Sequence, residues 1–135
     1  MATTTTDKLV PEDQSNRSLQ LALAAARTAA EDMGKDIVVL DMREQTTWFD
    51  YFVIATGSSR RQLHAMSEDI DHTLEDDLND KRMGIEGYAE SRWIVLDYGS
   101  IVIHLFDAET RQYYGLENLW ADAKRVDISH ILDRV

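Results

Sequence analysis

Residues 50–66 read DYFVIATGSSRRQLHAM and join an expected strand to an expected helix. Aromatic and β-branched residues fill 50–56, which favours a strand. Gly57 interrupts this run, and one of the two serines after it can cap a helix. Apolar residues at spacings of three and four then predict an amphipathic helix to residue 78: Leu63, Met66, Ile70, Leu74 and Leu78.

The sequence before this unit predicts one more helix and one more strand. Apolar residues recur at helical spacing from Asn16 on, and Gly34 follows them as a stop signal. They are Leu19, Leu23, Ala26, Ala30 and Met33. Residues 36–42, DIVVLDM, show little alternation, as expected for a strand covered on both faces.

The sequence after it predicts a hairpin and a short helix. Residues 92–98 (RWIVLDY) and 100–106 (SIVIHLF) are strand-like and are separated at Gly99-Ser100. Asp107 can cap a helix over 108–114 that ends at Gly115, and the irregular connection over 79–91 has room for a short strand. This order predicts a small mixed β-sheet flanked by helices, an α/β fold that borders on α+β.

The composition fits one domain of 135 residues, of which 44% are hydrophobic. Twenty-five acids against fourteen bases give a net charge of −11, which disfavours direct nucleic-acid binding and favours a basic partner. The absence of cysteine excludes disulfides and thiolate metal sites. No signal peptide or membrane-length apolar run is present, so we expect a soluble cytoplasmic protein with no membrane partner. We expect a flexible tail over 1–15, a domain over 16–122 and a C-terminal extension over 123–135.

An enzymatic alternative rests on Gly57-Ser58 and on Asp69 and Asp71, which loosely resemble a nucleotidyltransferase pattern. In such enzymes the turn holds phosphate and two carboxylates hold magnesium. The paired carboxylates must then lie on one face of a strand, whereas Asp69 and Asp71 fall in the predicted helix. Residues i and i+2 of a helix point about 200° apart. We therefore expect no catalytic residues here.

The histidines do not form a metal-binding pattern. His64 and His72 lie eight residues apart on the predicted helix, without the spacing of a zinc site. His104 alternates with Val102 and Phe106, and if that face is shared with Asp97 on the neighbouring strand, the two can form a hydrogen-bonded pair. We favour an orienting role over acid–base catalysis for this pair, because no third catalytic group is placed nearby. No metal or other cofactor is expected.

Two groups of residues suggest a surface that binds a partner. Large aromatic residues crowd the last third of the chain, where they either fill the core or anchor an interface: Trp93, Phe106, Tyr113, Tyr114 and Trp120. Seven acids occur between residues 66 and 80 without one base, and such a run either solubilises a helix face or steers a basic partner: Glu68, Asp69, Asp71, Glu75, Asp76, Asp77 and Asp80. Trp48 lies in a polar connection and is expected to plug an edge.

Five motifs together resemble the ribosomal silencing factor, or Iojap, family over about residues 18–123. They are DYFVIATGSSR (50–60), GIEG (84–87), WIVLDYG (93–99), VIHLF (102–106) and RQYYGLENLW (111–120). The resemblance implies a translation repressor, not an enzyme, that binds the large ribosomal subunit through its fourteenth ribosomal protein and blocks joining of the small subunit when nutrients are scarce. It also implies a fold similar to nucleotidyltransferases but without their active site, in which the domain over 16–122 is the silencing-factor domain.

The family signature falls on sixteen positions, nine of which we expect at the partner-binding surface. These nine are Trp93, Asp97, His104, Phe106, Arg111, Tyr114, Leu116, Glu117 and Trp120. The other signature residues are Asp50, Gly57, Ser59, Arg60, Glu86, Gly87 and Gly99. Ser100 and Tyr113 depart from the usual acid and phenylalanine. Two alternatives stay open: a nucleotidyltransferase-like enzyme that binds nucleotides, and a scaffold whose aromatic surface is the interface of a homodimer formed by the free protein.

Overall fold

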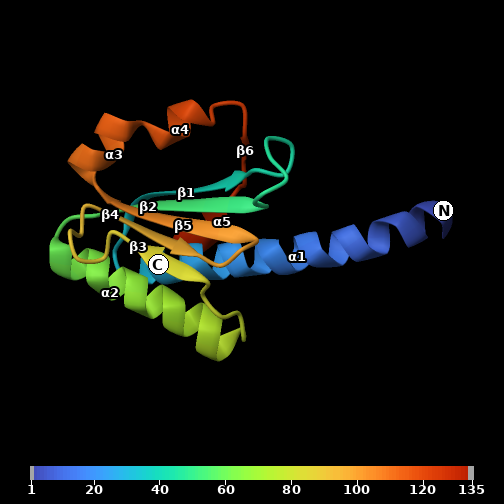
Figure 1. The fold of residues 1–135 in the computed structure, drawn as a ribbon, viewed down its shortest axis with the longest axis horizontal. Helices are drawn as coiled ribbons and strands as arrows, with labels where there is room; N and C mark the ends of the chain where they lie inside the picture. The colour runs from blue at the N-terminus through green and yellow to red at the C-terminus, as the bar shows by residue number, and fades with distance from the viewer. Residues whose placement is uncertain (1, 134–135) are drawn as a thin grey trace.

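The computed structural model describes residues 2–133, with side chains described from residue 16 to residue 133. Figure 1 shows a sheet with helices on both faces. The helical elements are α1 (Ala2–Glu31), α2 (Arg60–Asp71), the π-helical turn η1 (His72–Asp77), α3 (Ala108–Tyr114), α4 (Leu116–Leu119) and α5 (Ser129–Leu132). The strands are β1 (Lys35–Asp41), β2 (Tyr51–Gly57), β3 (Gly84–Glu86), β4 (Trp93–Asp97), β5 (Ile101–Asp107) and β6 (Lys124–Arg125). The predicted mixed sheet flanked by helices is confirmed.

The sheet has the strand order β3-β4-β5-β2-β1-β6. Its two central strands, β2 and β5, are parallel, and every other neighbouring pair is antiparallel. The connection between β2 and β5 carries α2, β3 and β4, as a parallel pair requires a long crossover. The strand and helix predicted from residues 50–66 thus form the centre of the sheet and the helix of the crossover.

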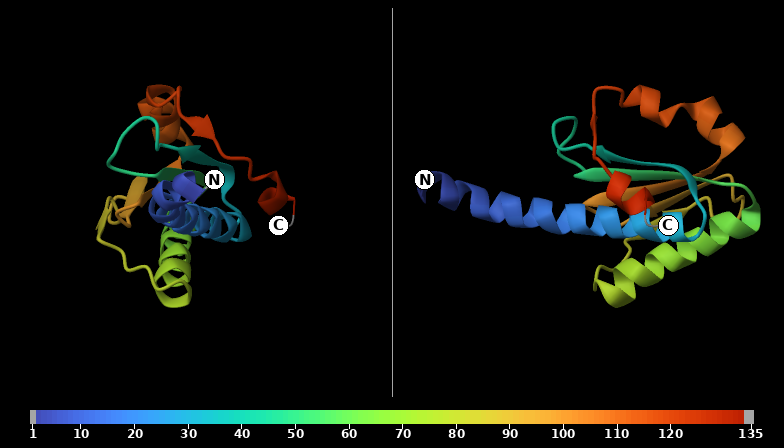
Figure 2. Two further views of the ribbon diagram at one scale, coloured as in Figure 1. Left: turned by 90° about the vertical axis from the view of Figure 1, so that its right-hand side faces the viewer. Right: turned by 180° about the vertical axis from the view of Figure 1, so that it is seen from behind.

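One face of the sheet is covered by α1 and α2, which lie on the same side in Figures 1 and 2. The α1 side chains in this core are mostly alanines, and their small size lets the helix approach the strands closely: Ala22, Ala25, Ala26, Ala29 and Ala30. Leu19 and Leu23 are only partly buried, and Met33 is exposed. The apolar stripe predicted for this helix is therefore rotated about the helix axis from the stripe that is buried. The prediction was ambiguous because the many alanines of this helix lie on several of its faces.

The opposite face carries a smaller core beneath α3 and α4. Leu40, Phe52, Ile54 and Phe106 are buried there, with Leu116 of α4 over them. Several large residues of this face are only partly buried: Val38, Phe49, Trp93, Val95 and Trp120. The two short helices therefore leave part of this face open at the β4 and β5 side.

Some elements differ from the expected ones at the ends of the chain. The expected helix start at Asn16 is wrong, because α1 begins at Ala2. The side chains of residues 1–15 lie outside the described ones, so the flexible tail stays a prediction. In the region expected as an extension, β6 pairs with β1, and Ile128 and Ile131 pack in the α1 core.

Candidate functional site

The β4–β5 hairpin brings four of the nine expected partner-binding residues onto one face. The Asp97 carboxylate accepts a hydrogen bond from the backbone N–H of Gly99 at 2.8 Å, and Gly99 adopts a φ of 85° that favours glycine. The turn fixes the register, which places Trp93 opposite Phe106 and Val95 opposite His104. The predicted hairpin is confirmed.

The helix after the hairpin adds tyrosines to the same face. Asp107 caps α3 by accepting from the backbone N–H of Thr110 at 2.7 Å, and Gly115 ends the helix with a φ of 57°. Both signals were predicted from the sequence. The short length of α3 leaves Tyr113 and Tyr114 at its end, 80% and 57% exposed.

Trp93 is the centre of an aromatic cluster. Its ring centroid lies 4.8 Å from that of Phe106 and 4.9 Å from that of Tyr114. Its indole N–H donates to Nδ1 of His104 at 3.1 Å. Because Trp93 is half-buried, one part of the ring packs on the fully buried Phe106 while another part remains accessible to a partner. We call Trp93, Tyr113 and Tyr114 the aromatic patch.

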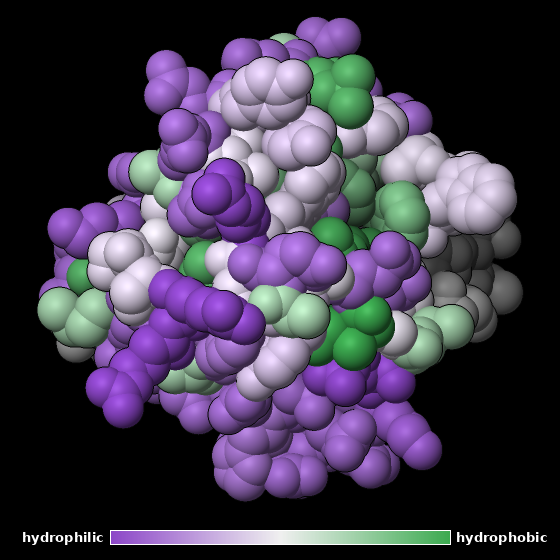
Figure 3. Space-filling view, turned by 60° about the vertical axis from the view of Figure 1, so that its left-hand side comes forward, coloured by the Kyte–Doolittle hydropathy of each residue, from purple (hydrophilic) through white to green (hydrophobic). Residues whose placement is uncertain are grey.

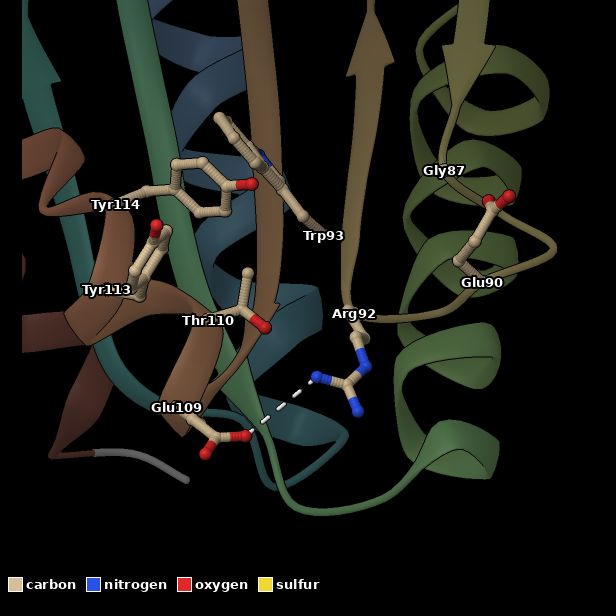
Figure 4. Close-up of a pocket in the computed structure, with 8 residues that line it drawn as sticks. All are labelled: Gly87, Glu90, Arg92, Trp93, Glu109, Thr110, Tyr113 and Tyr114. Carbon is tan, nitrogen blue, oxygen red and sulfur yellow. Dashed lines mark ion pairs between the residues drawn. The ribbon is translucent and has the colours of Figure 1, made fainter.

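A pocket of about 570 Å³ opens beside the aromatic patch. Figure 4 shows the patch on one side of it and Arg92 and Glu109 on the other. Their ion pair spans 3.8 Å between two exposed side chains, so it contributes little stability. Figure 3 shows pale and green atoms in the upper part of this side of the molecule and hydrophilic atoms in the lower part. The site thus combines an apolar contact area with two exposed charged side chains, Arg92 and Glu109, whose weak ion pair can be replaced by contacts with a partner.

His104 is buried, at 6% exposure, and burial lowers its pKa to about 4. The ring is therefore neutral at physiological pH. Because indole only donates, Nδ1 must be the acceptor and Nε2 carries the proton. The expected Asp97–His104 pair is wrong, since the described partner of His104 is Trp93 and the Asp97 carboxylate bonds to Gly99. Asp97 stands opposite Val102, one diagonal step from His104.

Arg111 and Glu117 form a second group that fixes α3 and α4 on the sheet. Arg111 donates to both carboxylate oxygens of Glu117, at 2.8 and 3.0 Å, and to Oγ1 of Thr56 on β2 at 2.7 Å. These hydrogen bonds lower the pKa of Glu117. Arg125 adds a weaker contact to the same carboxylate at 3.6 Å. Both predicted residues are therefore engaged within the chain.

The remaining expected residues divide between core and rim. Phe106 and Leu116 are buried, and Trp120 is partly buried, with its ring 6.3 Å from that of Phe52. Their contact with a partner stays a prediction. Leu119, which was not expected at the surface, is 73% exposed next to Trp120; its place in the motif LENLW gave no signal of this. Trp48, expected as an edge plug, is 80% exposed.

The residues of the enzymatic alternative are not assembled as that alternative requires. Asp69 and Asp71 both lie on α2, as predicted. Asp71 is engaged by the Tyr98 hydroxyl at 2.6 Å and by Arg82 at 3.7 Å. Among the described residues no group of three or more histidine or acidic side chains is arranged to hold a metal ion, and no described helix is long and apolar enough to cross a membrane.

A Ser–His contact that sequence reasoning missed is also structural. His64 Nε2 lies 2.6 Å from Ser91 Oγ and 2.8 Å from the carbonyl oxygen of Tyr88. A carbonyl only accepts, so Nε2 carries the proton and cannot take one from Ser91. The His64 ring also stacks on Tyr88 with centroids 4.0 Å apart. This contact therefore fastens the loop before β4 to α2.

Comparison with known proteins connects this arrangement to one family. The sequence model described as "Ribosomal silencing factor during starvation" matches residues 15–135. The ribosomal silencing factor RsfS of Bacillus subtilis is 39% identical over 115 residues, which cover 84% of this chain and 94% of that protein. A mouse protein named "Mitochondrial assembly of ribosomal large subunit protein 1" is 38% identical over 67% of this chain and 40% of its own length.

Solved structures share the fold. A crystal structure of a Chromobacterium violaceum protein superposes with a TM-score of 0.74 at 28% identity, covering 83% of this chain and 92% of that one. A crystal structure of a Bacillus halodurans protein gives a TM-score of 0.66 at 30% identity, covering 81% and 95%. The shared fold therefore covers 81–83% of this chain and 92–95% of each of these two proteins.

Proposed function

This chain belongs to the ribosomal silencing factor family, and we propose that it represses translation by binding the large ribosomal subunit through its fourteenth ribosomal protein. Bound there, it blocks joining of the small subunit. The family match across residues 15–135 carries this proposal. The name of the mouse relative, which refers to the large ribosomal subunit, supports the choice of subunit.

The charge of the chain supports a basic ribosomal protein as the partner. The net charge is −11, and Glu68, Asp69, Asp76 and Asp77 are exposed along α2 and η1. A field of this sign raises the rate at which a basic partner is encountered and disfavours bare RNA as the first contact. Electrostatic steering therefore brings the chain to protein on the subunit surface.

The aromatic patch supports the location of the contact. Tyr and Trp side chains that are exposed and held on a rigid base are typical anchors of protein interfaces. Trp93 packs on Phe106 and Tyr114 packs on Trp93, while Arg111 and Glu117 fasten the helices that present the tyrosines. In this proposal Trp93, Tyr114, Asp97 and Trp120 touch the partner. His104, Phe106, Arg111, Leu116 and Glu117 position them.

The proposed action is steric and needs no catalysis. Relatives are named silencing factors, a regulatory role, and the carboxylates of the enzymatic alternative lie on a helix and not on a strand. We propose that the chain acts in the cytoplasm, where ribosomes assemble from their subunits. A free homodimer that uses the same patch would have to dissociate before binding.

Two experiments test the proposal. The chain is first sedimented with isolated large subunits and, separately, with small subunits; we expect it to pellet only with the large ones. Separated subunits are then mixed with and without the chain, and we expect fewer whole ribosomes and less cell-free translation when it is present. Unchanged subunit joining at a saturating concentration of the chain would refute the proposal.

A further inference from the structure

The loop over residues 87–92, between β3 and β4, forms one wall of the pocket beside the aromatic patch. Gly87, Glu90 and Arg92 of this loop line the pocket, and Trp93 follows directly as the first residue of β4. In Figure 4 the loop passes between the pocket and α2. The position of the loop therefore sets both the shape of the pocket and the start of the strand that carries Trp93.

The loop has a backbone conformation that its own residues do not favour. Ser91 has a φ of 61°, in the left-handed region that serine rarely adopts, and it is buried at 4% exposure. One hydrogen bond closes the loop on itself, from the backbone N–H of Ser91 to the carbonyl oxygen of Gly87 at 2.9 Å. An unfavourable conformation persists only where the surrounding structure maintains it. Contacts from outside the loop must therefore hold it in place.

One face of α2 supplies such contacts. Arg60, His64 and Glu68 are spaced four residues apart, which places their side chains in one row along the helix. Nη2 of Arg60 donates to the carbonyl oxygen of Ala89 at 2.9 Å. Arg60 belongs to the sixteen signature positions but not to the nine expected at the partner-binding surface, and this hydrogen bond gives it a role.

The other two side chains of the row hold Tyr88 and Ser91. His64 stacks on Tyr88 with an angle of 4° between the rings, and its Nε2 donates to the Tyr88 carbonyl oxygen at 2.8 Å. The same Nε2 lies 2.6 Å from Oγ of Ser91, the residue with the unfavourable φ. Glu68 accepts a hydrogen bond from the Tyr88 hydroxyl. Together the three side chains of the row therefore contact the loop from residue 88 to residue 91.

We propose that Arg60, His64 and Glu68 are positioning residues of the partner-binding site, a proposal that rests on the function proposed above. The described lining of the pocket includes none of the three, so their effect on it passes through the loop. They keep the loop in the conformation that sets the pocket wall and the start of β4. Without them the loop relaxes toward conformations that Ser91 prefers. Binding must then restore the loop, which lowers the affinity for the partner.

Two arginine variants of equal charge test the proposal. Arg60→Met removes the hydrogen bond to Ala89 and keeps an apolar stem. Arg61→Met, the control, removes the same charge from the neighbouring exposed residue, which forms no hydrogen bond with the loop in the described part of the chain. We expect Arg60→Met to weaken binding of the folded chain to large ribosomal subunits about threefold, and Arg61→Met to leave it within about 1.5-fold. Loss of a positive charge helps an acidic chain to reach a basic partner, so weaker binding of Arg60→Met cannot come from steering.

Replacement of His64 by phenylalanine tests the centre of the row. Phenylalanine keeps a ring that can stack on Tyr88 but has no N–H for the loop. We expect about tenfold weaker binding of the folded chain to large subunits. His72→Phe is the matched control, because His72 is an exposed residue of η1 that pairs with Asp76, and we expect less than about a twofold change.

A spectroscopic signal separates positioning from a general loss of stability. The Trp93 indole N–H donates to His104, so its ¹⁵N–¹H signal reports a movement of Trp93; the signal is identified by its absence in Trp93→Phe. Below the thermal midpoint of each sample, we expect this signal to shift in Arg60→Met and His64→Phe but in neither control. Lower midpoints with an unshifted signal and unchanged affinity of the folded chain would overturn the proposal. Equal losses of affinity in Arg60→Met and Arg61→Met would also overturn it.

The test distinguishes this proposal from the function on which it rests. Failure of the unaltered chain to bind large subunits would refute the proposed function. The indole signal needs no partner, so it would still decide whether the row on α2 positions Trp93. A shift in Arg60→Met and His64→Phe would support that role, and an unshifted signal in both would overturn it.

Discussion

Replacement of Trp93 by phenylalanine and by alanine separates the hydrogen bond of this side chain from its packing. The indole both donates to His104 and stacks on Phe106 and Tyr114. Phenylalanine keeps an aromatic ring in this position but has no N–H. Alanine removes the ring as well. The two variants therefore remove different parts of the same contact.

The structure sets the magnitudes. Trp93→Phe leaves Nδ1 of the buried His104 without a donor, which costs about 1–2 kcal/mol of unfolding free energy. Trp93→Ala also removes the stacking contacts and leaves a cavity. Truncation of a large aromatic residue in a core lowers the unfolding free energy by about 3–5 kcal/mol, and because Trp93 is only half-buried we expect about 3 kcal/mol. Because Trp93 also belongs to the aromatic patch, Trp93→Ala should weaken binding of the folded chain to large subunits by about 2 kcal/mol.

Stability and binding are measured on the same samples. Denaturant unfolding gives the free energies, and titration of large subunits with the folded fraction gives the affinities. Equal stabilities of the unaltered chain and Trp93→Phe would refute the role of the indole N–H. If folded Trp93→Ala bound as tightly as the unaltered chain, Trp93 would be a core residue only and would leave the proposed interface.

Three further perturbations test separate parts of the structure. Gly87→Ala should destabilise the chain by about 3 kcal/mol or more, because Gly87 has a φ of 79° and an added Cβ would lie 2.0 Å from the Trp93 carbonyl oxygen. Gly84→Ala is the matched control, since no atom lies within 4 Å of its added Cβ. Equal thermal midpoints of the two variants would contradict this explanation. Glu117→Gln should cost about 1–2 kcal/mol at neutral pH by weakening the contact with Arg111. The pKa of Glu117 is lowered from its ordinary 4.5, so this stabilisation is complete above pH 4.5 and is lost as pH falls through the lowered pKa. The unfolding free energies of the variant and the unaltered chain should therefore converge in acid. A difference in unfolding free energy that stays constant with pH would refute the ion pair. The association rate with large subunits should fall as salt shortens the Debye length to about 8 Å, and a rate that does not depend on salt would reject electrostatic steering.

Local signals in the sequence were sufficient for most of the fold. Asp107 and Gly115 have side-chain and backbone properties that act within one turn, so the bounds of α3 followed from them directly. Gly99 marked the hairpin for the same reason, and Ser59 caps α2 by accepting from the Gln62 N–H. Such signals depend on few neighbours and can be interpreted without knowledge of the rest of the chain.

Features set by packing between distant segments could not be predicted in the same way. The buried face of α1 is lined by alanines, whose positions alone do not distinguish one helical face from the next. The predicted face shared by Asp97 and His104 was correct, since both line one pocket. The predicted bond was wrong, because Trp93 and Asp97 are both diagonal neighbours of His104 and the pattern of the strands does not say which of them bonds to it.

The two faces of the sheet differ in a way that restricts where a partner can bind. The face beneath α1 and α2 is closed by small side chains packed against Val53, Ala55 and Ile103, so a partner could reach these strands only by displacing a helix. The other face is covered by two short helices, α3 and α4, which do not extend over β4 and β3. There the half-buried Trp93 and the exposed tyrosines border the pocket that His104 lines. Burial of this border would remove apolar area from water without unfolding any element, and this is why we propose it as the place where the partner binds.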